Sequence, residues 1–184
     1  MKNKFIHVYD DVINRELQDY IEHMILYSED LEWNYVNSLN KSWWDDVWFC
    51  SHFYSYAQDE VYNKDYFFLF IQILYRFAGF SNISVEEILE ARAFKQPPSV
   101  NPGANMEWAH QDLNIPHWVC LYYVNDSDGD TILFEDDKKT VIQQVTPKKG
   151  RIVFFDGNIY HTSSKPKNNI RSVINIDFIW NHNI

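Results

Sequence analysis

Apolar residues near the start of the chain recur with the period of a helix. A short apolar run, Lys4–Tyr9, predicts a strand, and Asp10 and Asp11 then offer a helix N-cap. The apolar positions that follow are spaced i, i+4, i+7 and i+8, which places them on one face of an amphipathic helix reaching about Tyr27. These positions are Leu17, Ile21, Met24 and Ile25. We therefore expect a first helix with one buried face.

A longer apolar segment predicts a second, more buried helix over residues 57–77, which Gly79 is expected to stop. In the stretch "SNISVEEILE", serines followed by Glu86–Glu87 form a capping pattern and predict a third, shorter helix or turn. Between the first two helices, residues 33–53 are irregular and aromatic. The pair Trp43–Trp44 in that segment is more typical of a core than of a binding surface.

The pattern changes near Arg92, where prolines and glycines appear and short apolar runs alternate with turn residues. The runs are Trp118–Val124, Thr131–Phe134, Lys139–Val145, Arg151–Asp156 and Arg171–Trp180. Strands this short and this regularly spaced predict a sandwich or barrel. We expect a mainly β fold and a single domain over residues 1–184. A helical N-terminal elaboration, residues 1–91, would pack on one sheet of a β core formed by residues 92–184.

The last of these runs has two different faces. Because side chains alternate along a strand, one face carries Ser172, Ile174, Ile176, Phe178 and Trp180, and suits packing on helices. The other face carries Arg171, Val173, Asn175, Asp177 and Ile179. Polar groups that point inward are costly unless they meet a ligand or one another. The second face therefore predicts a polar cavity inside the β core.

Length and cysteine content limit the class of protein. The chain has 184 residues, of which 46% are hydrophobic, enough for one domain with a good core. No apolar run approaches the roughly 18 residues of a membrane span. The N-terminus lacks the apolar segment of a secretory signal. Cys50 and Cys120 are not spaced as a redox or zinc pair, so we expect buried, reduced thiols and a cytoplasmic location.

The net charge of −10 is unevenly distributed along the chain. Residues 1–91 carry 6 Lys and Arg against 16 Asp and Glu, whereas residues 92–184 carry 10 against 10. A surface this acidic repels phosphate backbones, so an extended contact with nucleic acid is not expected. The acidic half is typical of a solvated face that keeps a protein in solution.

The stretch "MEWAHQDLNIPHW" holds the first candidate chemistry. On a strand His110 and Asp112 would point to the same side, roughly 7 Å apart, and could share one metal ion. His161, which follows a buried strand and a short connection, is the candidate for a second imidazole. Two histidines and one carboxylate form the facial triad typical of non-haem Fe(II) oxygenases. His117 is a rival ligand that we expect at the cavity rim or on the surface. On the same strand, Trp108 would point to the same side as His110 and Asp112, so it is a candidate for the cavity wall.

From about Arg92 to Trp180 the chain resembles the 2-oxoglutarate- and Fe(II)-dependent oxygenases, particularly their prolyl-hydroxylase-like branch. Four features carry the resemblance in order. They are His110-x-Asp112, the strand "CLYYVND", the turn "DGDTILF", and "KKGRIVFFDGNIYHTS" followed ten residues after His161 by Arg171. Their order and spacing together are more specific than any one of them.

The resemblance implies a double-stranded β-helix, or jelly roll, with Fe(II) held by His110, Asp112 and His161. It implies that 2-oxoglutarate binds the metal and that Arg171 holds its far carboxylate. By the same resemblance Tyr123 would hydrogen-bond that end of the cosubstrate. Asn175, four residues past Arg171 and on its face, could add a further contact.

The implied activity is a dioxygenase that uses O2 and 2-oxoglutarate to hydroxylate a peptide side chain or a small metabolite, with release of succinate and CO2. The chain differs from the pattern of the oxygenases that it resembles in three ways. Asp128 replaces the first glycine of the turn, an upstream tyrosine is missing, and Arg171 stands where collagen-type members use lysine. Proline as the substrate therefore does not follow. Two alternatives are a catalytically silent jelly roll that binds a partner, and a nucleic-acid demethylase of the same superfamily. Segments 33–56 and 94–108 are expected to select the substrate.

Overall fold

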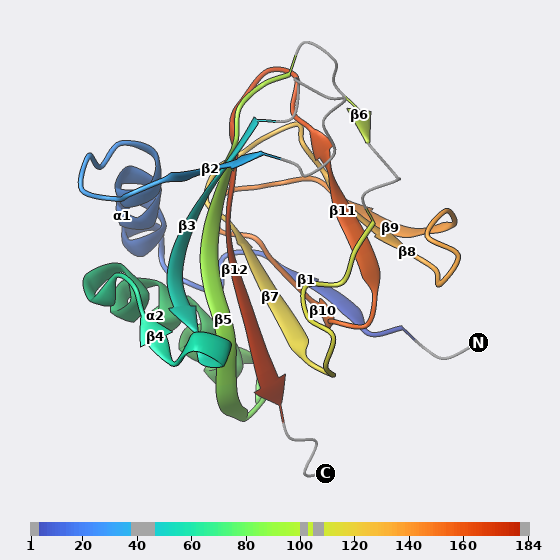
Figure 1. Ribbon diagram of the computed structural model, residues 1–184, viewed down its shortest axis with the longest axis horizontal. Helices are drawn as coiled ribbons and strands as arrows, with labels where there is room; N and C mark the ends of the chain where they lie inside the picture. The colour runs from blue at the N-terminus through green and yellow to red at the C-terminus, as the bar shows by residue number, and fades with distance from the viewer. Residues whose placement is uncertain (1–3, 38–46, 100–102, 105–108, 181–184) are drawn as a thin grey trace.

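Two antiparallel β-sheets lie face to face in the computed structural model, and the helices cover the outer face of the larger sheet (Figure 1). Residues 4–37, 47–99, 103–104 and 109–180 are described. The larger sheet has the spatial order β1 (Ile6–Tyr9), β10 (Ile152–Asp156), β7 (Trp118–Tyr123), β12 (Arg171–Trp180), β5 (Val85–Gln96), β3 (Val47–Ser55) and β2 (Asn34–Asn37), with β4 (Glu60–Val61) paired to β3. The smaller sheet has the order β6 (Gly103–Ala104), β11 (Tyr160–Lys165), β8 (Thr131–Phe134) and β9 (Val141–Val145).

This arrangement is a jelly-roll core with flanking helices, as predicted. Apolar side chains of β7, β10 and β12 meet those of β8 and β9 between the two sheets, among them Leu121, Leu133 and Val173. The strand β12 lies in the middle of the larger sheet and pairs with β7 on one side and β5 on the other. Its inward face therefore looks into the space between the sheets.

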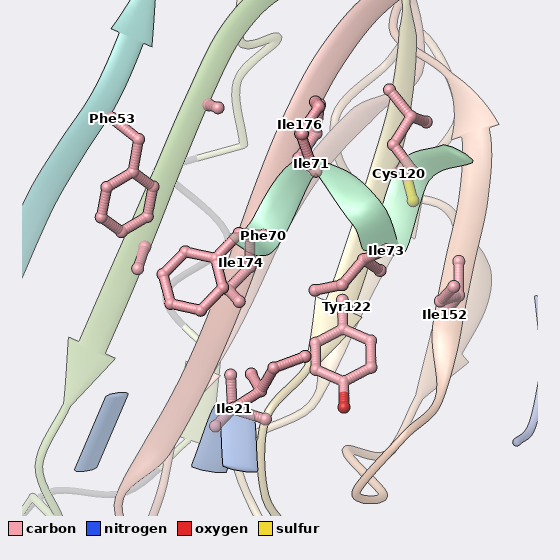
Figure 2. Packing of buried hydrophobic residues seen from close by; sticks show 14 of the residues in the cluster. Ile21, Phe53, Phe70, Ile71, Ile73, Cys120, Tyr122, Ile152, Ile174 and Ile176 are labelled. Carbon is pink, nitrogen blue, oxygen red and sulfur yellow. The ribbon is translucent and has the colours of Figure 1, made fainter. Parts of the chain in front are cut away.

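The outward face of β12 packs on the helices α1 (Arg15–Leu26) and α2 (Lys64–Ser81), as its alternation predicted. Ile174, Ile176 and Phe178 are completely buried in one cluster with Ile21 and Ile25 of α1. Figure 2 shows Ile21 and Phe70 close to Ile174 in this layer. The predicted contact between the first helix and the last strand is confirmed.

The prediction of a third helix or turn within residues 81–90 is wrong. This segment enters β5, a 12-residue strand that pairs with β12 on one side and β3 on the other. Leu89, Ala91 and Ala93 are buried at every second position, which is the period of a strand. Pairing with β12 and β3 on both sides outweighs the local capping pattern of Glu86–Glu87. As a result β5 spans the expected boundary at Arg92, and residues 1–91 contribute strands as well as helices.

The second helix begins later and ends later than predicted, at Lys64 and Ser81. Gly79 does not stop it, because glycine inside a helix costs only about 1 kcal/mol relative to alanine. The helix ends where Asn82 takes a left-handed conformation, with φ 56°, and its backbone N–H bonds the Ala78 carbonyl. A short 3-10 turn, η1 (Tyr56–Gln58), precedes it where the sequence predicted helix.

Cys50 and Cys120 are both buried and unpaired, as expected. Burial raises the pKa of the Cys50 thiol to about 11, so it stays protonated near neutral pH. Within the described residues, no helix is long and apolar enough to cross a membrane. Trp43–Trp44 and Trp108 lie outside the described residues.

Candidate metal centre

The structure brings His110, Asp112 and His161 together, and their potential ligand atoms all lie within 4.8 Å of one another. His161 Nε2 is 3.3 Å from Asp112 Oδ2, and His110 Nε2 is 3.8 Å from Asp112 Oδ1. The two imidazole rings lie 4.7 Å apart between centroids. The three side chains thus form one cluster of two nitrogens and a carboxylate.

The backbone structure that brings these residues together differs from the predicted strand. His110 is not in a regular strand: it forms an isolated β-bridge with His161, and Asp112 lies in a bend. His161 belongs to β11, a strand that is absent from the predicted apolar runs. Across the bridge His110 N–H donates to the His161 carbonyl at 3.0 Å, and the reverse bond is 2.9 Å. One pair of backbone hydrogen bonds therefore places both imidazoles side by side.

The electrostatics of the cluster suit a cation. Burial by itself would raise the pKa of Asp112, but attraction and hydrogen bonding to His161, together with Arg92, hold that pKa far below its ordinary value. Burial likewise opposes protonation of His161, and Asp112 overcomes it, so the His161 pKa is raised. His161 Nδ1 faces the Ile159 carbonyl at 3.2 Å. With Nδ1 donating there, Nε2 is the nitrogen that faces Asp112, and once deprotonated it can bind a metal, as in metal-binding histidines.

A cavity of about 260 Å³ opens beside the cluster and is lined by all three of its residues. The His110 side chain is 52% exposed, whereas those of Asp112 and His161 are 8% and 11% exposed, so the cluster meets solvent at His110. Trp48 and Phe94, from β3 and β5, form an aromatic part of the cavity wall. The predicted cavity at the inward face of β12 is therefore present.

Arg171 lies at this cavity and is buried, with 4% exposure. Its Nε donates to the Gly129 carbonyl and its Nη2 to Thr131 Oγ1, both at 2.9 Å. In the described part of the chain no carboxylate forms an ion pair with it, and Asp177, the other charged residue on this face, pairs with Arg92 instead. A buried guanidinium that bonds only neutral groups is ready to accept an anion.

The "DGDTILF" turn supports Arg171 directly. A Cβ on Gly129 would lie 3.0 Å from both Arg171 Cδ and the Ser164 carbonyl oxygen, so a larger residue would fit only if these neighbours shifted. Asp128, which replaces the other expected glycine, accepts backbone hydrogen bonds from Lys167 and Asn168 at 3.0 Å each. Asp128, which differs from the glycine expected at this position, thus holds the loop before β12.

Tyr123 and Asn175 lie beside this region, each with a partner of its own. Tyr123 is fully buried, and its hydroxyl donates to Thr131 Oγ1 at 2.6 Å, while its ring lies 5.8 Å from the Arg171 guanidinium carbon. Asn175 Nδ2 donates to Asp112 Oδ2 at 3.3 Å. Asn175 therefore contacts a predicted metal ligand, and Tyr123 reaches the cavity through Thr131. Their roles toward a cosubstrate remain predictions.

His117 is not at the rim or on the surface, and that expectation is wrong. The residue is 3% exposed, and its Nδ1 contacts the Ile115 carbonyl at 2.7 Å. Its ring fills the space that Gly157 leaves free, where a Cβ would come within 2.4 Å of the ring carbons. Its Nε2 lies 4.0 Å from Asp177 Oδ1. His117 is therefore an interior residue, and its potential ligand atom lies within 4.8 Å of carboxylate oxygens of both Asp177 and Asp112.

Sequence reasoning missed Arg92, which the structure places in the cluster. Its Nη2 donates to Asp177 Oδ2 at 2.9 Å and to Asp112 Oδ1 at 3.2 Å, and its Nη1 is 3.1 Å from Glu90 Oε2. Although burial opposes the charge, these carboxylates raise the pKa of the guanidinium further. In "LEARAF" the apolar residues Leu89, Ala91 and Ala93 alternate with Glu90 and Arg92, and this pattern could have identified Arg92 as a residue of the opposite strand face.

No family model matches the chain, and no curated protein does. Solved structures do match in fold. A prolyl-4-hydroxylase from Pseudomonas putida is 14% identical, with a TM-score of 0.56 over 96% of this chain and 92% of its own. An oxidoreductase of the 2OG-Fe(II) oxygenase family from Burkholderia pseudomallei is 9% identical, with a TM-score of 0.65 over 95% and 84%.

A third structure is the epimerase SnoN in complex with Fe3+, alpha-ketoglutarate and nogalamycin RO. It is 10% identical and has a TM-score of 0.63 over 97% of this chain and 80% of its own. Identities this low establish similarity of fold. The chain therefore shares the jelly-roll fold of the 2-oxoglutarate- and Fe(II)-dependent oxygenases that its motifs resemble.

Proposed function

We propose that this protein is an Fe(II)- and 2-oxoglutarate-dependent dioxygenase that hydroxylates a peptide side chain or a small metabolite. One observation carries the proposal: a His-Asp-His cluster and a buried arginine that pairs with no described carboxylate line the same cavity. A jelly roll that only binds a partner has no need for both features inside its core.

The residues present fit a divalent metal. Two imidazole nitrogens and one carboxylate are the donor set of non-haem Fe(II) sites, and they leave other coordination positions open. His110, Asp112 and His161 would hold the ion. Bound there, iron would supply the activation of O2 that is coupled to oxidative decarboxylation of 2-oxoglutarate. The buried carboxylate of Asp112, kept ionised by its neighbours, offsets part of the ion's charge.

The other end of the cavity fits a carboxylate. Thr131 Oγ1 accepts hydrogen bonds from Arg171 Nη2 at 2.9 Å and from the Tyr123 hydroxyl at 2.6 Å. A hydroxyl has two lone pairs and one hydrogen, so the Thr131 hydrogen is left for a third group. Arg171 and Thr131 both line the cavity and together would donate to the far carboxylate of 2-oxoglutarate. Tyr123 would act by fixing the direction of the Thr131 hydroxyl.

The part of the cavity that would receive the substrate is bordered by aromatic side chains. Proteins of this fold are found in complex with different molecules: one match is a prolyl hydroxylase in complex with a peptide fragment of hypoxia inducible factor, and another is an epimerase in complex with nogalamycin RO. Here Trp48 and Phe94 border the cavity, and they belong to the two segments expected to select the substrate. An aromatic wall of this kind favours a substrate that presents an apolar or ring-shaped group.

Turnover without substrate tests the proposal. Purified protein supplied with Fe(II), O2 and 2-oxoglutarate should release succinate slowly, and the His161→Ala variant should release none. Titration of 2-oxoglutarate into anaerobic Mn(II)-loaded protein should show binding at one site per chain. Absence of both metal binding and succinate release from folded protein would instead support a silent binding protein.

A further inference from the structure

A single guanidinium lies among three carboxylates directly behind the candidate metal centre. Arg92 Nη2 lies between Asp112 Oδ1, at 3.2 Å, and Asp177 Oδ2, at 2.9 Å. Its other terminal nitrogen is 3.1 Å from Glu90 Oε2. The side chain of Asp177 has no exposed surface and that of Asp112 has 8%. One nitrogen of Arg92 therefore joins a buried structural carboxylate to a predicted metal ligand.

Strand register accounts for this position. In the larger sheet Arg92 of β5 is paired with Asn175 of β12, and Glu90 is paired with Asp177. Side chains of these four residues project toward the space between the sheets, since Ala91 and Ala93 occupy the alternate positions in the helix-facing core. Arg92 is thus held by two flanking strands of a rigid sheet.

Asp112 has no comparable support from its own backbone. It lies in a bend two residues past the His110–His161 bridge, outside any strand. Its orientation therefore depends on side-chain contacts, and its two oxygens have different ones. Arg92 bonds Oδ1, whereas Oδ2 faces His161 Nε2 at 3.3 Å and receives a hydrogen bond from Asn175, also at 3.3 Å.

From these contacts we infer that Arg92 is a positioning residue for Asp112, and that Asp177 is the anchor that holds Arg92 in place. The inference rests on the proposed function, because it assigns Asp112 to a metal. By engaging Oδ1, Arg92 favours coordination through one carboxylate oxygen. A carboxylate bound through both oxygens would occupy a second position that the cosubstrate or O2 needs. Groups that orient metal ligands in this way typically contribute 10- to 100-fold to metal affinity or activity.

A purely structural role is the competing explanation, since Arg92 also neutralises the fully buried Asp177. Removing Arg92 alone would leave that charge unpaired and endanger folding. The double variant Arg92→Met/Asp177→Asn removes the cation and the buried anion together, so it separates the two roles. Arg92→Lys is the conservative companion: its ammonium keeps the charge but lacks the planar fork that reaches separate carboxylates.

The control is Lys149→Met. Lys149 also joins two carboxylates, Asp19 and Glu22 of α1, and its side chain is 22% exposed against 15% for Arg92. All variants are measured in two ways: free energy of unfolding in urea, and Mn(II) affinity of the folded protein by anaerobic titration. The electron paramagnetic resonance spectrum of bound Mn(II) reports the symmetry of its ligands independently of activity.

We expect the Arg92→Met/Asp177→Asn variant to bind Mn(II) 10- to 100-fold more weakly, with an altered Mn(II) spectrum, and Arg92→Lys to lie between it and wild type. Lys149→Met should lose only stability and keep wild-type Mn(II) affinity. A folded double variant with Mn(II) affinity within threefold of wild type and an unchanged spectrum would overturn the role of Arg92. If wild-type protein itself binds no Mn(II), the proposed metal centre is wrong, and the inference fails with it.

Discussion

His110 and His161 exchange two backbone hydrogen bonds, of 3.0 and 2.9 Å, across an isolated β-bridge. Because the backbone holds this pair, either imidazole can be removed without loss of the bridge. We predict that His161→Ala abolishes Mn(II) and Fe(II) binding and succinate release while the protein stays folded, as measured by calorimetric titration and circular dichroism.

The matched comparison is His117→Leu, which removes another buried imidazole of the same molecule. It should keep Mn(II) affinity within about threefold on the folded fraction, since the carboxylate closest to His117 is that of Asp177, which is not a predicted ligand. Loss of the metal from this variant, with retention in His161→Ala, would mean that the wrong histidine has been assigned.

Replacing Arg171 tests the cosubstrate site. Leaving a carboxylate unpaired inside the cavity costs about 3–5 kcal/mol, so Arg171→Met should weaken 2-oxoglutarate binding by roughly two to four orders of magnitude. Mn(II) binding should survive, because Arg171 is not a ligand, and Arg171→Lys should lie between. Calorimetric titration of 2-oxoglutarate into the Mn(II) form measures the effect. An affinity within threefold of wild type in the folded Met variant would refute the assignment.

Gly129 provides an indirect test of the same site. A methyl group there would meet Arg171 Cδ and the Ser164 carbonyl oxygen at 3.0 Å. Gly129→Ala should therefore lower stability by about 1–3 kcal/mol and weaken 2-oxoglutarate binding while Mn(II) affinity is kept. Gly79→Ala in α2 is the control, because nothing lies within 4 Å of the added carbon, and it should be neutral or stabilising. Urea unfolding and ligand titration measure both variants; unchanged 2-oxoglutarate affinity in Gly129→Ala would contradict this view of the turn.

The packing of helix on sheet predicts large losses at two buried positions. Ile21→Ala and Phe178→Ala should each lower the free energy of unfolding by about 2–5 kcal/mol, because both side chains are fully buried in one cluster. Tyr20→Ala, at a position that is 51% exposed, should change it by about 0.5 kcal/mol or less. A fragment of residues 88–184 should not fold alone, since it lacks the helices and β3. A cooperative melting transition of that fragment would contradict this.

An exposed ion pair predicts a pH dependence. The hydrogen bond from Arg151 lowers the pKa of Asp10 to about 2, although burial opposes the shift. Because the folded-state pKa is below the ordinary value of 3.8, the stabilisation is present above about pH 4 and is lost as the pH falls through 2. Asp10 is 35% exposed, so Asp10→Asn should cost only about 0.5–1 kcal/mol at pH 7. Thermal melts at pH 7 and pH 2 should show this difference become much smaller at the lower pH; a pH-independent difference would exclude the ion pair as its cause.

Much of the fold was readable from local pattern. The bounds of β8 and β12, and the buried face of α1, follow from alternation and from helical spacing, which are properties of each segment alone. The same alternation placed Arg171 and Asn175 on the inward face of the last strand. The residues of the three-membered cluster were also identifiable, because their types, order and spacing match a known donor set.

Other features depend on which strands meet. β5 was missed because its pairing partners, β3 and β12, stabilise it from distant parts of the chain, and local capping residues indicated a helix instead. His117 was expected at the cavity rim or on the surface because a single sequence does not reveal the space left by Gly157.

The amino-acid types, order and spacing alone identify the groups of the site: two imidazoles, a carboxylate and an arginine. The hydrogen-bond and ion-pair partners of these groups depend on the tertiary fold. Asp177 shares a strand face with Arg171 yet pairs with Arg92, and Asp112 takes its orientation from Arg92 and Asn175. Charges pair according to their distance in space and not along the chain. The register of β5 against β12 brings Arg92 within hydrogen-bond distance of Asp177, and the fold brings Asp112 to the same guanidinium.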